Sequence, residues 1–402
     1  MRIAIFSDNF YPELSGITDT IMTTGRELAR RGHFINYYAP YYSSKNYEML
    51  RREQNLDMGP RVTIHRLPSL PFPAGTGQGR AVIPVGASLF SLRKFKPDVI
   101  HFHLIFGTGL EALLAAKIFK KPLVGTNHTP IAEFIRYSPI KAGWFQKFAA
   151  RYDSWFYNHC SFVSSPAQAV LGAMKSFNTN IPHSAVSNPI NLDVFKPTAA
   201  KWALKKKFHL PGFTMLYVGR LAVEKNIAVT MKAVARLGEK IPDLNFVIIG
   251  KGAHEKELRK LAKSLDVERR IKFFGFLPST DALADVYNAC DTFIMMSTAE
   301  TQSIASMQAL ACRIPVIAAN SWGLKEYIKP GVGFLVEPGN IEALAEKILY
   351  LYKNPQRRET MGKEGEKYVA RFSIENIGNI WEQIYEKVIK DYNNNNARRE
   401  PS

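Results

Sequence analysis

The sequence predicts an α/β protein made of two doubly wound, Rossmann-like domains. Short apolar runs alternate with amphipathic stretches through the first half of the chain, and the alternation starts again at Thr214. The length of 402 residues exceeds that of one ordinary domain. Because ligands of open parallel sheets bind at the carboxyl ends of the strands, the segments that follow the apolar runs are the first places to look for function.

In the first half, two such segments carry candidate residues. The turn-rich stretch D-N-F-Y-P-E-L-S-G contains Gly16, which either lets the backbone approach a ligand or only turns the chain. His128, in N-H-T-P, can donate to a substrate hydroxyl or phosphate, or it is a loop histidine bonded to backbone. The expected strands are 2–7, 34–39, 62–67, 98–102, 122–126 and 161–164, and the expected helices include 17–31 and 108–119.

A basic amphipathic helix is predicted within residues 137–160. Aromatic residues recur there at helical spacing with basic residues between them. Such a helix can lie in a membrane interface. The alternative is that the aromatic stripe belongs to the core and the basic face is solvated. The aromatic positions are Trp144, Phe145, Phe148, Tyr152 and Trp155, and the basic ones are Lys141, Lys147 and Arg151.

The second half repeats the arrangement of strand followed by polar loop. A buried strand from Thr214 runs into Gly219 and Arg220, and a helix is expected to begin near Lys225. Two cations at one strand end can hold a diphosphate, or they are solvated surface residues. The strand in 245–252 ends in glycines, including Gly252, without the full spacing of a dinucleotide fingerprint or a P-loop. The strand and turn 271–277 end in backbone that can meet a base.

The stretch 292–320 is predicted to form a strand, a loop, a helix and a second strand. Ser303 is a suitable N-cap for the helix, and Pro315 ends it. The helix start offers free N–H groups and a positive dipole end to a phosphate. Glu300, in the loop, can accept hydrogen bonds from a polyhydroxylated ligand, or it only favours the helix N-terminus. A final helix is expected over 373–392, followed by a disordered polar tail.

Composition narrows the class of protein. The net charge of +18 attracts an anionic partner, such as nucleic acid, anionic lipid or a phosphorylated substrate. The three cysteines lack metal-like spacing and fit a reducing cytoplasm. The first residues of the chain predict a strand rather than a signal peptide. No apolar run approaches the roughly 20 residues of a membrane span. No zinc-like cluster, G-x-S-x-G elbow or nucleic-acid module is recognisable.

Taken together, several strand-end motifs resemble those of the retaining GT-B glycosyltransferases of family 4. In order they are N-F-Y-P-E-L-S-G-I, N-H-T, N-P-I-N-L-D-V-F-K-P, Y-V-G-R-L-A-V-E-K-N, I-I-G-K-G, F-F-G-F-L and E-T-Q-S-I-A-S-M-Q-A-L-A-C-R-I-P-V-I-A. They cover about residues 1–390. The E-T-Q variant looks most like the branch that glycosylates diacylglycerol and related membrane lipids.

The resemblance implies an acceptor-side domain over 1–190 and a nucleotide-sugar domain over 196–372, facing each other across a cleft. The last helix, about 373–392, would cross back onto the first domain. Arg220 and Lys225 would neutralise the diphosphate, so neither a metal ion nor another cofactor is expected. Glu300 and His128 would bind the donor sugar. The further donor-binding positions implied are Gly16, Gly219, Gly252, Phe276, Leu277, Ser303, Ile304 and Gln308.

Two positions depart from the family pattern. The family carries two glutamates eight residues apart, and the second is here Gln308, which keeps an acceptor oxygen for the ribose but loses the charge. Ser303 replaces the usual glycine. Both changes bear on donor affinity.

The predicted function is transfer of a hexose, glucose from a UDP-linked donor, to a membrane lipid such as diacylglycerol, with retention of configuration by front-face attack. The expected partners are the nucleotide sugar, the lipid acceptor and an anionic membrane surface on the cytoplasmic side, with no nucleic acid. The alternatives are a soluble sugar or polysaccharide acceptor, a homologue that no longer binds a donor, and a basic binding protein without activity.

Overall fold

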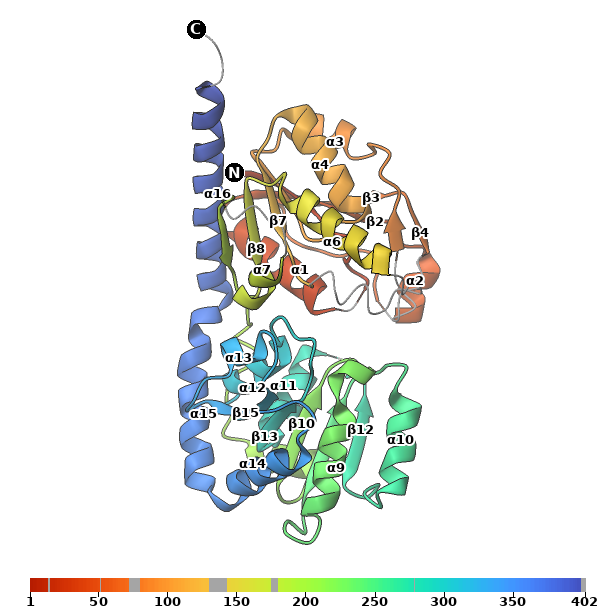
Figure 1. Ribbon diagram of the computed structural model, residues 1–402, viewed down its shortest axis with the longest axis vertical. Helices are drawn as coiled ribbons and strands as arrows, with labels where there is room; N and C mark the ends of the chain where they lie inside the picture. Colours follow the sequence, from red (N-terminus) through yellow and green to blue (C-terminus); the bar gives the residue numbers. More distant parts are fainter. Residues whose placement is uncertain are drawn as a thin grey trace. The chain divides into compact units, whose positions relative to one another are not determined.

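A computed structural model describes residues 1–13, 15–50, 52–71, 80–129, 143–174, 180–277 and 279–398. The chain divides into two compact units (Figure 1). Unit 1 comprises Met1–Pro189 together with Ile374–Ser402, and unit 2 comprises Ile190–Ser373. Each unit contains one parallel sheet covered by helices, which confirms the predicted pair of doubly wound α/β domains.

Unit 1 has a seven-stranded sheet in the order β3-β2-β1-β6-β7-β8-β9, in which every pairing is parallel. Apolar residues on alternate sides of β1 serve two cores. Ala4 and Phe6 pack on one side, and Ile3 and Ile5 on the other. The strands are β1 (Arg2–Phe6), β2 (Phe34–Pro40), β3 (Val62–Leu67), β6 (Val99–Phe102), β7 (Leu123–Thr126), β8 (Phe162–Ser165) and β9 (His183–Ala185).

Helices bury both faces of this sheet. Leu92, Leu113 and Phe156, from α3, α4 and α6, fill one core, while α1 and α16 contribute to the other. An antiparallel pair, β4 (Ser69–Pro71) with β5 (Arg80–Val82), lies outside the main sheet. The helices are α1 (Gly16–Arg30), α2 (Ser44–Leu50), α3 (Leu89–Phe95), α4 (Gly107–Phe119), α6 (Gly143–Tyr157), α7 (Gln168–Ala173) and α16 (Ile374–Ala397).

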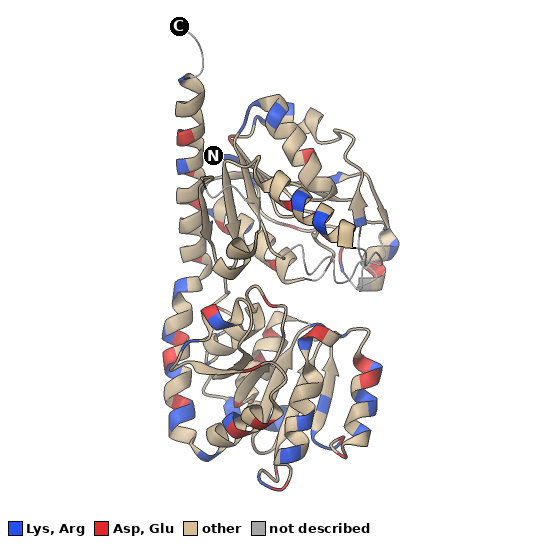
Figure 2. Ribbon diagram, in the orientation of Figure 1, with Lys and Arg blue, Asp and Glu red and all other residues tan. Residues whose placement is uncertain are grey.

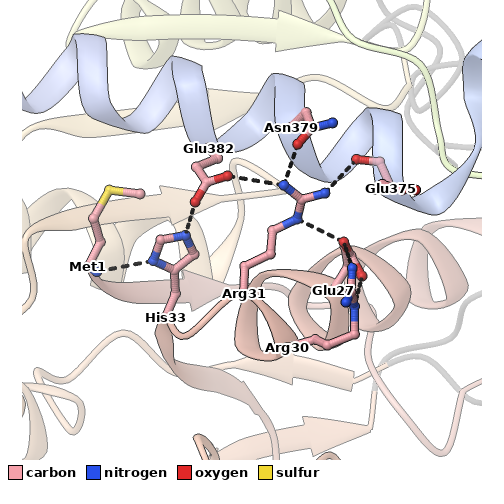
Figure 3. A network of polar contacts seen from close by, with 8 residues as sticks. All are labelled: Met1, Glu27, Arg30, Arg31, His33, Glu375, Asn379 and Glu382. Atoms are coloured by element: carbon pink, nitrogen blue, oxygen red, sulfur yellow. Dashed lines mark hydrogen bonds and ion pairs between the residues drawn. The ribbon is translucent and has the colours of Figure 1, made fainter.

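The last helix is attached to unit 1 by a polar network (Figure 3). Glu382 on α16 accepts from Arg31 at 3.1 Å and contacts the His33 ring at 2.8 Å. Arg31 also donates to Glu27 at 2.8 Å and to the backbone oxygen of Glu375 at 2.9 Å. Burial acts to raise the pKa of Glu382, but the hydrogen bonds from His33 and Arg31 outweigh it and hold the pKa below its ordinary value. Trp381 and Tyr385 add apolar burial on the same helix.

Unit 2 has a six-stranded parallel sheet in the order β12-β11-β10-β13-β14-β15. Its strands are β10 (Thr214–Val218), β11 (Asn245–Ile249), β12 (Ile271–Gly275), β13 (Thr292–Met295), β14 (Val316–Ala319) and β15 (Gly333–Val336). Its helices are α8 (Lys201–Lys207), η1 (Val223–Lys225), α9 (Ile227–Leu237), α10 (Glu255–Ser264), α11 (Thr280–Ala289), α12 (Ile304–Ala311), α13 (Leu324–Tyr327), α14 (Ile341–Lys353), α15 (Pro355–Val369) and η2 (Ala370–Phe372).

One terminal prediction is wrong. A disordered polar tail is predicted after residue 392, but α16 continues through its asparagines to Ala397. Residues 399–402 of that tail lie outside the described part of the chain. Once packing has fixed the first turns of a helix, each further residue adds a hydrogen bond without a new nucleation cost, so weak helix formers can follow. Within the described ranges, no helix is both long and apolar enough to cross a membrane.

Candidate functional site

The candidate site of unit 2 lies where the strand order of its sheet reverses. β10 and β13 are neighbours, and the connections that follow them lead to opposite halves of the sheet. Loops at the carboxyl ends of such a strand pair border a crevice, which is where ligands of open α/β sheets bind. The segment from Gly219 to Lys225 follows β10, and the segment with Glu300 follows β13.

Glycines bring two backbone segments into direct contact at this edge. Gly219 donates its N–H to Ile249 at 3.0 Å, and Leu221 donates to Lys251 at 3.0 Å. A Cβ atom on Gly252 would lie 2.1 Å from the carbonyl oxygen of Leu221, which real structures do not tolerate. Glycine is therefore required at position 252 if the loop after β11 is to pack on the loop after β10.

Both predicted cations of this edge have carboxylate partners. Lys225 Nζ lies 2.5 Å from Glu300 Oε1, with 15% and 16% of the two side chains exposed. Arg220 Nη2 lies 2.7 Å from Glu224 Oε1, and its side chain is 42% exposed. The backbone oxygen of Arg220 accepts a hydrogen bond from the Tyr217 hydroxyl at 2.9 Å. The pair between Lys225 and Glu300 joins the two sides of the switch point.

The start of α12 is capped as predicted. Ser303 Oγ accepts from the N–H of Ser306 at 3.2 Å, and Ser303 is 3% exposed. Among the described residues, no acceptor is present for the N–H groups of Ser303 and Ile304. These N–H groups are free to meet an anion, as the first donors of a helix usually are.

The remaining donor-site candidates also lie at this edge. Phe276, which follows β12, is 54% exposed. Gln308 lies one turn into α12, and its Oε1 lies 3.2 Å from the Tyr287 hydroxyl. The single proton of that hydroxyl also has the backbone oxygen of Ala305 at 3.0 Å as an acceptor. An amide oxygen can accept two hydrogen bonds, so both the oxygen and the N–H group of Gln308 remain available to a ligand.

The candidate residues of unit 1 lie on the edge of its own sheet. Gly16 opens α1, which Ser15 caps by accepting from Thr18 N–H at 3.1 Å. His128 follows β7 and is 5% exposed. Its Nε2 lies 2.9 Å from Nδ1 of His103, which follows the neighbouring strand β6. Burial lowers the pKa of His128 to about 3, so the ring is neutral near pH 7.

The structure thus brings Arg220, Lys225 and Glu300 to the carboxyl ends of the neighbouring strands β10 and β13 of unit 2, while Gly16 and His128 belong to unit 1. The sequence did not identify three residues that contact the predicted site residues, namely Glu224, Tyr287 and His103. The signal for His103 was the pattern V-I-H-F-H, which ends a strand expected beside that of His128. No group of three or more His, Cys, Asp or Glu side chains that could hold a metal ion occurs in the part of the chain that the structure describes.

Comparisons with known proteins agree with this architecture. A family model described as Glycosyltransferase Family 4 matches residues 14–194, and one described as Glycosyl transferases group 1 matches residues 200–368. The alpha-monoglucosyldiacylglycerol synthase of Acholeplasma laidlawii is 26% identical over 409 residues, with 98% of each chain covered. The GDP-mannose-dependent alpha-mannosyltransferase of Mycobacterium tuberculosis is 25% identical, covering 99% of this chain and 98% of that protein.

A solved structure shows the same fold. Anabaena HepE in complex with UDP has a TM-score of 0.74 at 21% identity, with 96% of this chain and 99% of that chain covered. Two Rossmann-like units that match these family models define a glycosyltransferase of the GT-B fold. The chain belongs to glycosyltransferase family 4, and it is a hexosyltransferase.

Proposed function

We propose that the chain transfers glucose from a UDP-linked donor to a membrane lipid such as diacylglycerol, with retention of configuration. The observation that carries the proposal is the pair between Lys225 and Glu300 at the switch point of unit 2, with Arg220 beside it. A nucleoside diphosphate sugar carries negative charge on its phosphates and hydroxyls on its sugar. A cation and a carboxylate held side by side match those two features.

In this proposal unit 2 binds the donor. Arg220 and Lys225 contact the diphosphate, and the free N–H groups of Ser303 and Ile304 add to the positive potential there. Because Lys225 already lies against Glu300, the ammonium group holds that carboxylate in one orientation. Glu300 then accepts hydrogen bonds from the sugar hydroxyls with its second oxygen.

The donor base and ribose meet the neighbouring strand ends. Backbone near Phe276 and Leu277 contacts the base, and Gly16 on unit 1 borders the diphosphate and acceptor. Gln308 offers the ribose hydroxyls its amide group, whose oxygen keeps an acceptor position beside Tyr287. Gly219 and Gly252 keep the loops close enough for backbone to reach the phosphates.

Retention follows from attack on the face that the diphosphate leaves. The bond between the anomeric carbon and the phosphate oxygen breaks, with its electrons passing to the diphosphate. The acceptor oxygen bonds to the same carbon on the same face, and its proton passes to a leaving-phosphate oxygen. Arg220 and Lys225 stabilise the charge that develops on the diphosphate in this step. Neutral His128 hydrogen-bonds a sugar hydroxyl and carries no positive charge that would compete with Arg220 and Lys225 for the phosphates.

A membrane acceptor is supported by α6. Trp144, Phe148 and Trp155 are 67%, 61% and 46% exposed, so these aromatic side chains are not part of the core. Their spacing places them on one side of the helix with Arg151, and Figure 2 shows basic positions along α6. Exposed aromatic and basic side chains on one helix face suit the interface of an anionic membrane. Lys141, expected on the same helix, lies outside the described residues.

Two further apolar side chains of unit 1, on α3 and α4, are also exposed. Phe90 on α3 is 88% exposed, and Ile118 on α4 is 52% exposed. Arg93, Lys94 and Lys117 lie on the same two helices. Each Lys or Arg near an anionic bilayer contributes about 1 kcal/mol to binding.

The donor is tested by thermal shift with UDP, GDP, ADP and their sugar conjugates, repeated on Glu300→Ala. A ligand at 100 times its dissociation constant stabilises the folded state by about 2.7 kcal/mol. We expect UDP and UDP-glucose to raise the melting temperature, and Glu300→Ala to weaken the response to UDP-glucose more than that to UDP. A response to GDP alone refutes the UDP assignment, and no response to any nucleotide refutes donor binding.

The acceptor is tested by co-sedimentation with phosphatidylglycerol vesicles at about 0.15 M salt, where charges separated by more than about 8 Å are screened. The double variant Trp144→Ser with Trp155→Ser should lower binding at least about 10-fold, since each buried aromatic adds more than 1 kcal/mol. Trp202→Ser is the matched control, because Trp202 is 77% exposed on unit 2. Failure of the wild-type protein to bind these vesicles favours a soluble acceptor.

A further inference from the structure

His128 and His103 form a buried imidazole pair that the proposed chemistry does not yet explain. Nδ1 of His103 lies 2.9 Å from Nε2 of His128. The rings are stacked with their centroids 5.1 Å apart, and the two residues are 6% and 5% exposed. They come from the ends of the neighbouring strands β6 and β7, so the sheet itself holds them together.

We propose that His103 is a positioning residue that decides which ring nitrogen of His128 carries the proton. The other nitrogen of His128, Nδ1, has no hydrogen-bond partner among the described residues. It is the nitrogen left to meet a sugar hydroxyl. The role of His128 toward the sugar rests on the proposed function, whereas the control of its tautomer does not.

The argument follows from counting protons. Burial lowers the pKa of His128 to about 3, and burial together with the neighbouring histidines lowers that of His103 well below its ordinary value. Both rings are therefore neutral near pH 7, and each carries one N–H. A single N–H lies between Nδ1 of His103 and Nε2 of His128. If His103 donates it, His128 carries its own proton at the free Nδ1. If His128 donates it from Nε2, the free Nδ1 carries no proton.

A polar cavity beside the pair can couple the tautomers of the two rings to neighbouring hydroxyls. A small cavity of about 20 Å³ is lined by His103, His128, Thr20 and Thr24. The hydroxyls of both threonines are buried and have no partner among the described residues. This volume is sufficient for one water molecule, which needs two to four polar partners. A water bonded to the two hydroxyls and to the free nitrogen of His103 can donate to that nitrogen or accept from it. The direction that this network adopts sets the tautomer of His103, and thereby that of His128.

The third histidine of the cluster belongs to a separate chain of hydrogen bonds. His101 Nδ1 lies 2.7 Å from the Tyr385 hydroxyl, and its Nε2 lies 2.7 Å from Thr126 Oγ1. Both of its nitrogens are engaged, so it has none left for His128. Tyr385→Phe is therefore a control for the cavity, which Tyr385 also lines, because it removes the hydrogen bond to His101 and leaves the one between His103 and His128 in place.

The test reads the ring nitrogens of ¹⁵N-labelled full-length protein by long-range NMR at pH 7 without ligand. We expect one neutral tautomer of His128 in the wild-type protein and in Tyr385→Phe, and a mixture in His103→Phe, which keeps the stacked ring without a nitrogen. His103→Asn places a polar atom at the position of Nδ1 and should restore a single tautomer. His103→Gln places the polar atom at the position of Nε2 and should not restore a single tautomer. If His103→Phe does not fold, the comparison of His103→Asn with His103→Gln provides the test.

Turnover is measured on the same variants with the donor found by thermal shift. We expect kcat to fall about 10- to 100-fold in His103→Phe with little change in KM, and to recover in His103→Asn. A mixed tautomer in the wild-type protein, or one that His103→Phe leaves unchanged, overturns the proposal. Unchanged kcat in a variant whose tautomer has shifted overturns its catalytic consequence. Absence of any donor response refutes the proposed function alone, since the tautomer is read without ligand.

Discussion

Removing the cations of the unit 2 crevice gives the sharpest test of the proposed chemistry. The changes are Lys225→Ala and Arg220→Ala. Lys225 pairs with Glu300 at 2.5 Å, and both side chains are largely buried. Arg220 pairs with Glu224 at 2.7 Å, but its side chain is 42% exposed. The Glu224 side chain is only 5% exposed, so both variants remove a cation from a mostly buried carboxylate and should resemble each other in stability and in activity.

The magnitudes follow from these environments. Lys225→Ala leaves the mostly buried carboxylate of Glu300 without its partner, which costs about 1–3 kcal/mol of folding free energy. Arg220→Ala removes the cation beside the Glu224 carboxylate, whose side chain is only 5% exposed, and should cost a similar amount. Each variant loses one group that stabilises charge on the leaving diphosphate, so turnover should fall about 100- to 1,000-fold, equivalent to about 2.7–4 kcal/mol of transition-state stabilisation.

The assay is release of nucleoside diphosphate under saturating donor and acceptor, with chemical denaturation run in parallel on each variant. Lys232→Ala serves as the control, because Lys232 is an exposed lysine on α9 of the same unit. Near-normal turnover in both Lys225→Ala and Arg220→Ala would refute the reasoning. An equal loss in Lys232→Ala would show that the effect is not local to the crevice.

Three further predictions concern stability. Glu382→Gln should destabilise the chain by about 1–2 kcal/mol in urea denaturation, because Arg31 then loses its carboxylate on α16. Burial raises the pKa of Asp153 to about 7, above its unfolded value of 3.8, so its contribution is fully present below pH 3.8 and is lost as pH rises through 7. Asp153→Asn should therefore gain up to about 4 kcal/mol over wild type between pH 4 and pH 8. Gly252→Ala should lower donor affinity and melting temperature together, because its Cβ meets the backbone of Leu221 at 2.1 Å.

Each of these predictions has a contrary result. Unchanged urea midpoints in Glu382→Gln would mean that apolar packing alone holds α16. A difference between Asp153→Asn and wild type that does not vary with pH would exclude titration of that carboxyl. Gly172→Ala, which adds a Cβ into open space on α7, is the control for Gly252→Ala, and an equal loss there would contradict the backbone contact.

The elements near the site were predictable because their signals are local. The apolar run 292–297 predicted β13 (Thr292–Met295), and Ser303 before a run of helix formers predicted the start of α12. Both follow from backbone preferences that depend on a few neighbouring residues. The alternation of such units predicted the doubly wound class, which the sheet orders of both units confirm.

The pairing of side chains depended on tertiary structure. Lys225 and Glu300 are 75 positions apart, and Nδ1 of His103 meets Nε2 of His128 across 25 positions. Such partners are neighbours only because β10 lies beside β13 and β6 beside β7, and spacing along the chain carries no record of strand order. The helical continuation of α16 to Ala397 likewise depended on packing elsewhere in unit 1. The chain's own residues therefore specify the elements and the kinds of groups at their ends, while strand order and packing decide which groups meet.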